Sequence, residues 1–141
     1  MRFLIIVKAT PESEAGRMPS EELLARMAEY HEQLAQAGLL RDGSGLRPSS
    51  SGWRVEYDGA QTTLVDGPFA ETRELVAGYT LIETETREQA LEWTRRFPNP
   101  AVDGGRAQIE VRPLFELEDF EDGPAMERHR ALDASQREKR S

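Results

Sequence analysis

Two segments of this chain carry apolar side chains on both faces of a strand, and this pattern constrains the fold more than any other feature. Residues 3–7 read Phe-Leu-Ile-Ile-Val inside a strand predicted over 2–8, so both alternating sets of side chains are apolar. Residues 75–83 repeat the pattern on most of both faces. Strands of this kind lie at the centre of a sheet that is covered on both sides. The sequence therefore predicts two central strands whose sheet needs a cover on each face.

Two helices are predicted between the strands. Ser20 is a good N-cap, and apolar residues recur at helical spacing until Gly38 ends the first helix. Thr86 and Gln89 form a capping box for the second helix, which stops at Pro98. The remaining predictions are a loop at 11–19 and extended segments at 39–46, 53–57, 62–65 and 108–115.

The order of these elements predicts an α+β protein with a ferredoxin-like βαββαβ fold. The Asp58-Gly59 turn joins the strands on either side of it into an extra hairpin. In this fold both helices lie on one face of the sheet, so the other apolar face of the central strands needs a separate cover. The simplest cover is the sheet of a second copy in a two-fold dimer, and the sequence therefore predicts a homodimer.

The charge balance excludes several classes of partner. The 141 residues include 18 Lys and Arg against 26 Asp and Glu, a net charge of −8. Binding to nucleic acid or to an anionic membrane needs a basic face, so neither partner is expected. The longest apolar run, residues 3–7, is far shorter than the ~20 residues of a transmembrane helix or the ~7–15 of a secretory leader. We therefore expect a cytoplasmic protein, and without cysteines it has no disulfide or thiolate metal site.

The last part of the chain differs from the rest. Residues 1–117 form the predicted domain, and residues 118–141 form a charged tail with few large apolar side chains. Asp122 is a predicted N-cap and Pro124 a first-turn residue of a helix in this tail. We expect the tail to be either a marginal helix or disordered.

One stretch, from Asp66 to Glu74, reads Asp-Gly-Pro-Phe-Ala-Glu-Thr-Arg-Glu. Further matching pieces lie at Gly45–Pro48, Gly78-Tyr79, Ala90–Trp93 and Val111–Pro113. Over about residues 1–115, this pattern resembles the YCII-related proteins of the DGPF type. The resemblance implies a dimeric α/β barrel in a bacterial cytoplasmic protein. Genes of this type often neighbour extracytoplasmic-function sigma factors, which the resemblance implies as a partner.

The broader YCII family has a proposed His–Asp pair with its histidine on the first helix. Counted back from Gly38, that histidine falls near Met27, and His31 lies one turn later. The proposed pair therefore does not transfer residue for residue. On the buried stripe of its helix, His31 has three open roles: a satisfied residue at the core or pocket edge, an acid–base group, or a metal ligand. His129 lies in the tail and is predicted to be solvated.

Asp66 precedes Gly-Pro and has two open roles. Its carboxylate either accepts a hydrogen bond from the Phe69 N–H and fixes the turn, or faces a pocket as a general base or ligand contact. Glu71 and Glu74 are three residues apart and share a face if the chain is helical there. They are either exposed loop charges or a carboxylate pair for acid–base work or cation binding.

Arg47 and Tyr79 are predicted ligand contacts. Arginine is a forked donor for carboxylate or phosphate, and the alternative for Arg47 is an ion pair with Glu71 or Asp66. Tyr79 stands beside Gly78, which leaves room either for a ligand or for another backbone.

Two functions follow from these residues. The first is small-molecule binding in a pocket between sheet and helix lined by His31, Arg47, Asp66 and Tyr79, extending to a lyase or isomerase. His31 and Asp66 are then the catalytic candidates, Glu71 joins Arg47 and Tyr79 as a ligand contact, and no cofactor or metal is expected. The alternative is a non-enzymatic accessory protein that contacts a sigma factor through the acidic surface and the tail. A cleft favours the first function, and an apolar patch on the tail without a cleft favours the second.

Overall fold

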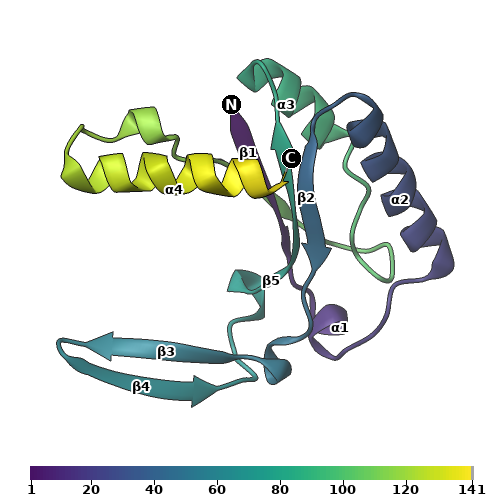
Figure 1. Cartoon of the computed structure of the whole chain (residues 1–141). Coiled ribbons are helices and arrows are strands. Elements are labelled where there is room, and N and C mark those ends of the chain that lie inside the picture. The colour runs from purple at the N-terminus through teal and green to yellow at the C-terminus, as the bar shows by residue number, and fades with distance from the viewer. Residues whose placement is uncertain (141) are drawn as a thin grey trace.

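The chain folds as an α+β protein around a four-stranded antiparallel sheet, in a computed structural model that describes residues 1–140 (Figure 1). The strands of this sheet are β1 (Arg2–Lys8), β2 (Leu40–Gly45), β5 (Val76–Glu83) and β6 (Ile109–Pro113). Their order is β2-β5-β1-β6, and each neighbouring pair is antiparallel. This order confirms the ferredoxin-like fold, and the two strands predicted to be central are the central ones.

Helices α2 and α3 cover one face of the sheet. The helices of the chain are α1 (Pro11–Glu14), α2 (Glu21–Gln36), α3 (Arg87–Arg95) and α4 (Pro124–Arg140). Both predicted N-caps are present, since the Ser20 hydroxyl accepts from the Leu23 N–H and the Thr86 hydroxyl from the Gln89 N–H, each at 3.1 Å. The predicted capping box is only half formed, because the Gln89 side chain accepts from the Glu85 N–H instead of the Thr86 N–H. The predicted sequence signals therefore set where both long core helices begin.

The core lies between these helices and the sheet. Ile5, Leu34 and Ile82 are 0% exposed and come from β1, α2 and β5. Burying an aliphatic side chain of this size contributes about 1.5–3 kcal/mol each. Tyr30 of α2 is also buried, and its hydroxyl donates to the Trp93 carbonyl oxygen at 2.8 Å. This bond satisfies the one polar atom that Tyr30 brings into the core and ties α2 to α3.

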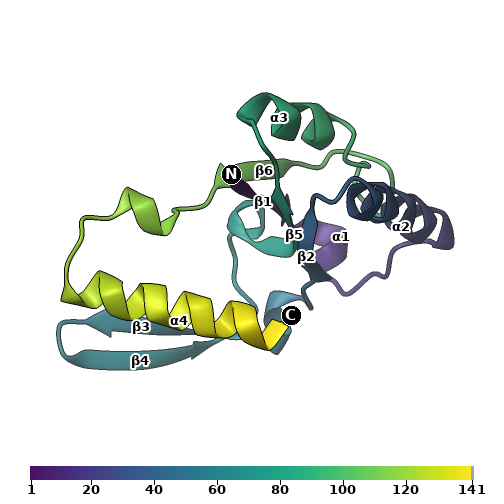
Figure 2. The same ribbon diagram turned by 45° about the horizontal axis from the view of Figure 1, so that its top comes forward.

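The opposite face of the sheet is covered less completely. Leu4 pairs with Leu81 and Ile6 with Tyr79, and all four side chains remain partly exposed in a single copy. The hairpin strands are β3 (Trp53–Asp58) and β4 (Gln61–Asp66), which form a separate two-stranded sheet. Figures 1 and 2 show this hairpin and α4 projecting away from α2 on the same side of the molecule. Helices α2 and α3 therefore cover the apolar side chains on one face of the central strands, and the apolar side chains on the other face remain partly exposed.

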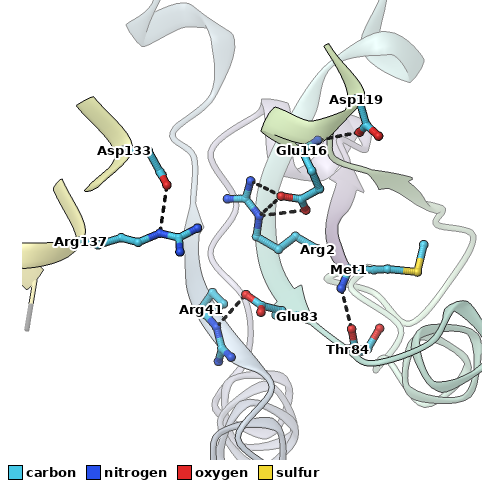
Figure 3. Close-up of polar contacts among 9 residues, drawn as sticks. All are labelled: Met1, Arg2, Arg41, Glu83, Thr84, Glu116, Asp119, Asp133 and Arg137. Atoms are coloured by element: carbon cyan, nitrogen blue, oxygen red, sulfur yellow. Dashed lines mark hydrogen bonds and ion pairs between the residues drawn. The ribbon is translucent and has the colours of Figure 1, made fainter. Parts of the chain in front are cut away.

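Polar contacts join the segment before α4 to the sheet (Figure 3). The Arg2 guanidinium donates to the Glu116 carboxylate, with Nη2 and Oε2 at 2.9 Å, and this bond holds the pKa of Glu116 below its usual value. Most of the tail forms α4, which buries no residue. It begins at Pro124, and the Asp122 carboxylate accepts from Arg130 instead of acting as the predicted N-cap.

One helix was not predicted. Residues 11–19, expected to be a loop, begin with the single turn of α1, where the Thr10 hydroxyl accepts from the Ser13 N–H and the Ser13 hydroxyl accepts from the Thr10 N–H. Thr10 followed by Pro11 is a start signal for such a turn. Within residues 1–140, no helix is long and apolar enough to cross a membrane.

Candidate functional site

A cleft of about 620 Å³ opens between α2, the edge strand β2 and the loop after α1. Most of its lining is apolar, contributed by Met18, Leu23, Leu24, Met27, Leu46, Phe97 and Val102 among others. The polar and charged groups among its lining include His31, Arg47 and Tyr79, which the sequence singled out, together with Arg17, Ser44 and Thr80. A mostly apolar concavity with a few polar groups is typical of a small-molecule site.

His31 stands on the face of α2 that meets the sheet. Its Nδ1 lies 2.8 Å from the Met27 carbonyl oxygen, and its Nε2 lies 2.8 Å from the Thr80 hydroxyl. A carbonyl oxygen only accepts, so Nδ1 carries the proton in the neutral ring, and Nε2 then accepts from the Thr80 hydroxyl. Both ring nitrogens are therefore satisfied, and the tautomer is fixed by the helix backbone.

Glycines let the two strands approach closely at the floor of the cleft. A Cβ on Gly78 would lie 3.0 Å from the Ser44 carbonyl oxygen, so this glycine makes room for the backbone of β2 rather than for a ligand. A Cβ on Gly43 would lie 3.6 Å from His31 Nε2, which is ordinary contact. Gly43 thus leaves open the space immediately beside the imidazole.

Arg47 lines the cleft with its side chain, whereas Tyr79 does not. Thr80 faces His31 on α2, so the Tyr79 side chain lies with Ile6 on the opposite face of the sheet, where its hydroxyl donates to Asp42 Oδ2 at 3.0 Å. Arg47 is exposed, and within residues 1–140 its guanidinium has no ion-pair or hydrogen-bond partner. The predicted ion pair with Glu71 or Asp66 is therefore wrong.

Asp66 and Glu71 do not line this cleft. The stretch Asp66–Glu74, here called the signature loop, instead packs on the short turn Ser49–Ser51, which follows the cleft residues Arg47 and Pro48. The structure therefore does not bring the catalytic candidates His31 and Asp66 together. The physical reason is that Asp66 pairs with Trp53 at the base of the hairpin, in the separate two-stranded sheet, while His31 contacts Thr80 of the main sheet from α2.

The signature loop is held by hydrogen bonds to that turn. The Gly67 N–H donates to the Gly52 carbonyl oxygen at 3.0 Å, and the Phe69 N–H donates to Ser49 Oγ at 3.1 Å. The acceptor of the Phe69 N–H is thus Ser49, and the prediction that Asp66 caps this group is wrong. A Cβ on Gly67 would overlap the Ser49 carbonyl oxygen and lie 2.7 Å from its carbon. Only glycine allows this approach.

Glu14 of α1 completes the same cluster. Its carboxylate accepts from the Ser49 N–H at 2.9 Å and also from the Ser49 hydroxyl. We call the group Glu14, Ser49, Gly52, Gly67 and Phe69 the latch. It joins three segments that are far apart in the sequence, and sequence reasoning missed it because Glu14 and Ser49 have no motif of their own.

The other predicted residues take no part in the cleft. Glu71 and Glu74 flank or belong to a 3₁₀ turn, Thr72–Glu74, and both are exposed. His129 is exposed on α4, as predicted. In the described part of the chain, no group of three or more histidine, aspartate or glutamate side chains is arranged to hold a metal ion.

Comparison with known proteins gives three findings. Residues 1–117 match the YCII-related domain family. An uncharacterized protein of Rhizobium meliloti (strain 1021) is 30% identical over 94 residues, which are 67% of this chain and 74% of that protein. Among solved structures, the 5-chloro-2-hydroxyhydroquinone dehydrochlorinase of Burkholderia phenoliruptrix AC1100, in complex with 2,5-dihydroxybenzoquinone, is 18% identical with a TM-score of 0.44. The match covers 82% of this chain and 94% of that one.

Proposed function

This chain belongs to the YCII-related family, and we propose that it binds a small molecule in the cleft between α2 and the edge strand β2. The observation that carries this proposal is the cleft itself, about 620 Å³ with a largely apolar lining and few polar groups. Small-molecule sites have this size and composition. Of the predicted contacts, the cleft brings together the side chains of His31 and Arg47, while Tyr79 adjoins it through its backbone.

A proton-transfer role for His31 extends this proposal to a cofactor-free lyase or isomerase. The observation in its favour is that the Met27 carbonyl fixes the tautomer, so that Nε2 is the basic nitrogen and faces Thr80 at the cleft. In that role the Thr80 hydroxyl would turn to another acceptor as a ligand proton approaches Nε2. Asp66 has no place in such a step, because it lies outside the cleft.

The test is a ligand screen on the full chain with a matched pair of glycine variants. Gly43→Ala places a methyl group 3.6 Å from His31 Nε2, whereas Gly52→Ala adds one in ordinary contact, 3.7 Å from Ser49, outside the cleft. Compounds from a metabolite mixture that raise the melting temperature of the wild type should lose this effect in Gly43→Ala and keep it in Gly52→Ala. Equal responses of the two variants would contradict the cleft as the binding site.

We further propose that two copies assemble through the sheet face opposite α2, as in a dimeric α/β barrel. Leu4, Ile6 and Leu81 leave an apolar strip on that face, and the hairpin beside it exposes Trp53 (66%) and Tyr57 (76%). Burying such side chains against a second copy supports a closed two-fold assembly. Analytical ultracentrifugation should give about twice the chain mass of 15.9 kDa. A stable monomer at micromolar concentration would contradict the dimer.

The accessory role with an extracytoplasmic-function sigma factor, in the bacterial cytoplasm, is the alternative proposal. It predicts an apolar docking patch on the tail. In the described part of the tail, the exposed large apolar side chains are Phe120, at 44%, and Leu132, at 58%. These two residues, one before α4 and one on it, fall short of the contiguous apolar patches that mark protein interfaces. The cleft therefore favours small-molecule binding over the accessory role.

A further inference from the structure

The charges around the cleft are unlike those of the chain as a whole. The chain has 26 acidic and 18 basic residues. Among the described residues that line the cleft, however, Arg17 and Arg47 are the full charges, and none is aspartate or glutamate. A cleft that concentrates cations in an acidic protein raises the local concentration of anionic ligands.

Both arginines are free to bind such a ligand. Within residues 1–140, neither Arg17 nor Arg47 has an ion pair or a side-chain hydrogen bond, whereas Arg2, Arg41 and Arg130 each contact a carboxylate. Holding an arginine unpaired leaves its planar, forked donor available for a carboxylate or a phosphate.

Two carboxylates that adjoin cleft-lining residues in the sequence accept hydrogen bonds from protein donors instead. The two oxygens of Glu14 accept from the N–H and hydroxyl of Ser49, two residues after Arg47. The two oxygens of Asp42 accept from the Gly43 N–H at 2.8 Å and from the Tyr79 hydroxyl at 3.0 Å. Both carboxylates are thus engaged within the protein, and neither is paired with Arg17 or Arg47.

The apolar side chains of the lining favour a ligand that has an apolar body. Met18, Leu24 and Leu46 line the cleft and are 79%, 49% and 49% exposed. Large apolar side chains exposed together at a concavity mark a binding surface rather than ordinary surface scatter. Met18 and Met27, with flexible thioether side chains, can adapt to the shape of an apolar group.

We propose that the ligand is a small amphipathic acid, whose anionic head group is bound by Arg47 and Arg17 and whose apolar body lies against Met18, Leu24 and Leu46. This inference rests on the proposed small-molecule function and names the class of ligand. A carboxylate and a phosphate share the required head-group chemistry, and the experiment below separates them.

The test compares probes that share one apolar body. Octanoate, octyl phosphate, 1-octanol and octylamine are titrated into the full chain below their aggregation concentrations, with methionine methyl signals as the NMR readout. The chain has 4 methionines, of which Met18 and Met27 line the cleft while Met1 and Met126 do not. Binding in the cleft should shift the signals of Met18 and Met27 and leave those of Met1 and Met126 unchanged.

We expect an anionic probe to bind about tenfold or more tightly than octanol, and octylamine to bind most weakly. The tighter of octanoate and octyl phosphate identifies the head group.

Two variants with the same change in charge separate the contribution of Arg47 to anion binding from a general effect of charge. Arg47→Ala removes a cleft cation, and Arg26→Ala removes an exposed cation of α2 that does not line the cleft. Arg47→Ala should remove most of the preference for the anion over octanol, the rest being due to Arg17, and Arg26→Ala should retain most of the preference. Equal binding of the anions and octanol in the wild type, or equal losses in the two variants, would overturn the anionic-ligand inference while the cleft remained a binding site. If octanol and the anions all leave Met18 and Met27 unshifted, the proposed function falls together with the inference.

Discussion

Arg47-Pro48 and Ser49–Ser51 are adjacent in the sequence, yet they belong to two regions of opposite character. Pro48 and Arg47 line the cleft, where the Arg47 guanidinium has no partner among residues 1–140. Ser49 belongs to the latch, where its N–H, its hydroxyl proton and its hydroxyl oxygen are all used in hydrogen bonds. The polar groups of the latch are bonded within the protein, whereas the cleft contains a guanidinium without a partner among the described residues.

This difference bears on how a conspicuous motif should be interpreted. The stretch Asp66 to Glu74 is the most distinctive in the sequence, and its Gly67 and Phe69 hold the latch together. Where backbone is buried or closely packed, its N–H groups need hydrogen-bond acceptors and its side chains must not clash. Both requirements restrict which residues can occupy those positions. A binding cleft needs only suitable shape and available charge, so its residues form no compact motif.

The most severe test of the latch is Gly67→Ala. The new methyl group would overlap the Ser49 carbonyl oxygen, so we expect a loss of about 3 kcal/mol or more in the free energy of unfolding. Gly52→Ala is the matched control, because its Cβ lies 3.7 Å from the same oxygen and its φ of −115° suits alanine. Urea denaturation measures both. Similar midpoints for the two variants would show that the loop is free to move off the turn.

Ser49→Ala should have the next largest effect. It leaves the Phe69 N–H without its acceptor and the Glu14 carboxylate without the hydroxyl donor, which we expect to cost about 1–3 kcal/mol of stability. Ser50 is exposed beside it, so Ser50→Ala should stay within about 0.5 kcal/mol of the wild type. If the two serine variants melt alike, the hydrogen bonds of the latch carry little of the stability.

Tyr30→Phe probes the support of the cleft wall, because Tyr30 anchors α2. Losing the bond to the Trp93 carbonyl should cost about 0.5–1.5 kcal/mol at pH 8. Burial raises the pKa of Tyr30 to about 12, against ~10 in the unfolded chain. The stability linked to the neutral phenol is therefore complete below pH ~10 and is lost as the pH rises toward 12.

Thermal melts between pH 8 and pH ~11 test this linkage. The wild type should lose stability over the alkaline part of this range more steeply than Tyr30→Phe, so that the gap between them narrows. Parallel curves would mean that the pKa of Tyr30 is the same in the folded and the unfolded chain, contrary to the burial of this side chain at 4% exposure.

Asp66→Ala should have the smallest effect of all. Asp66 is exposed, and within residues 1–140 its carboxylate has no hydrogen-bond or ion-pair partner, so we expect a change below about 0.5 kcal/mol. A loss of 1 kcal/mol or more on urea denaturation, in the range of a helix or turn cap, would restore the capping role that the structure gives to Ser49.

How far sequence reasoning reached depended on the range of the interactions involved. The caps at Ser20 and Thr86, and the Asp58-Gly59 hairpin, depend on neighbours within four residues, and all three are present in the structure. The candidate site was found in part, since His31 could be placed by the periodicity of its own helix. Asp66 was assigned the wrong hydrogen bond, because the real acceptor, Ser49, is 20 residues from Phe69.

The sequence by itself determined the α+β class, the two central strands and the face of α2 that carries His31, because alternation and helical spacing are local and follow from backbone geometry. Only the tertiary structure decided that Arg47 remains unpaired beside an apolar cleft and that Ser49, Glu14 and Gly67 meet in the latch. Which side chains become partners across 20 or 35 residues depends on how the loops cross once the sheet has formed. That crossing is set by the summed packing of the whole chain, and no short stretch of sequence encodes it.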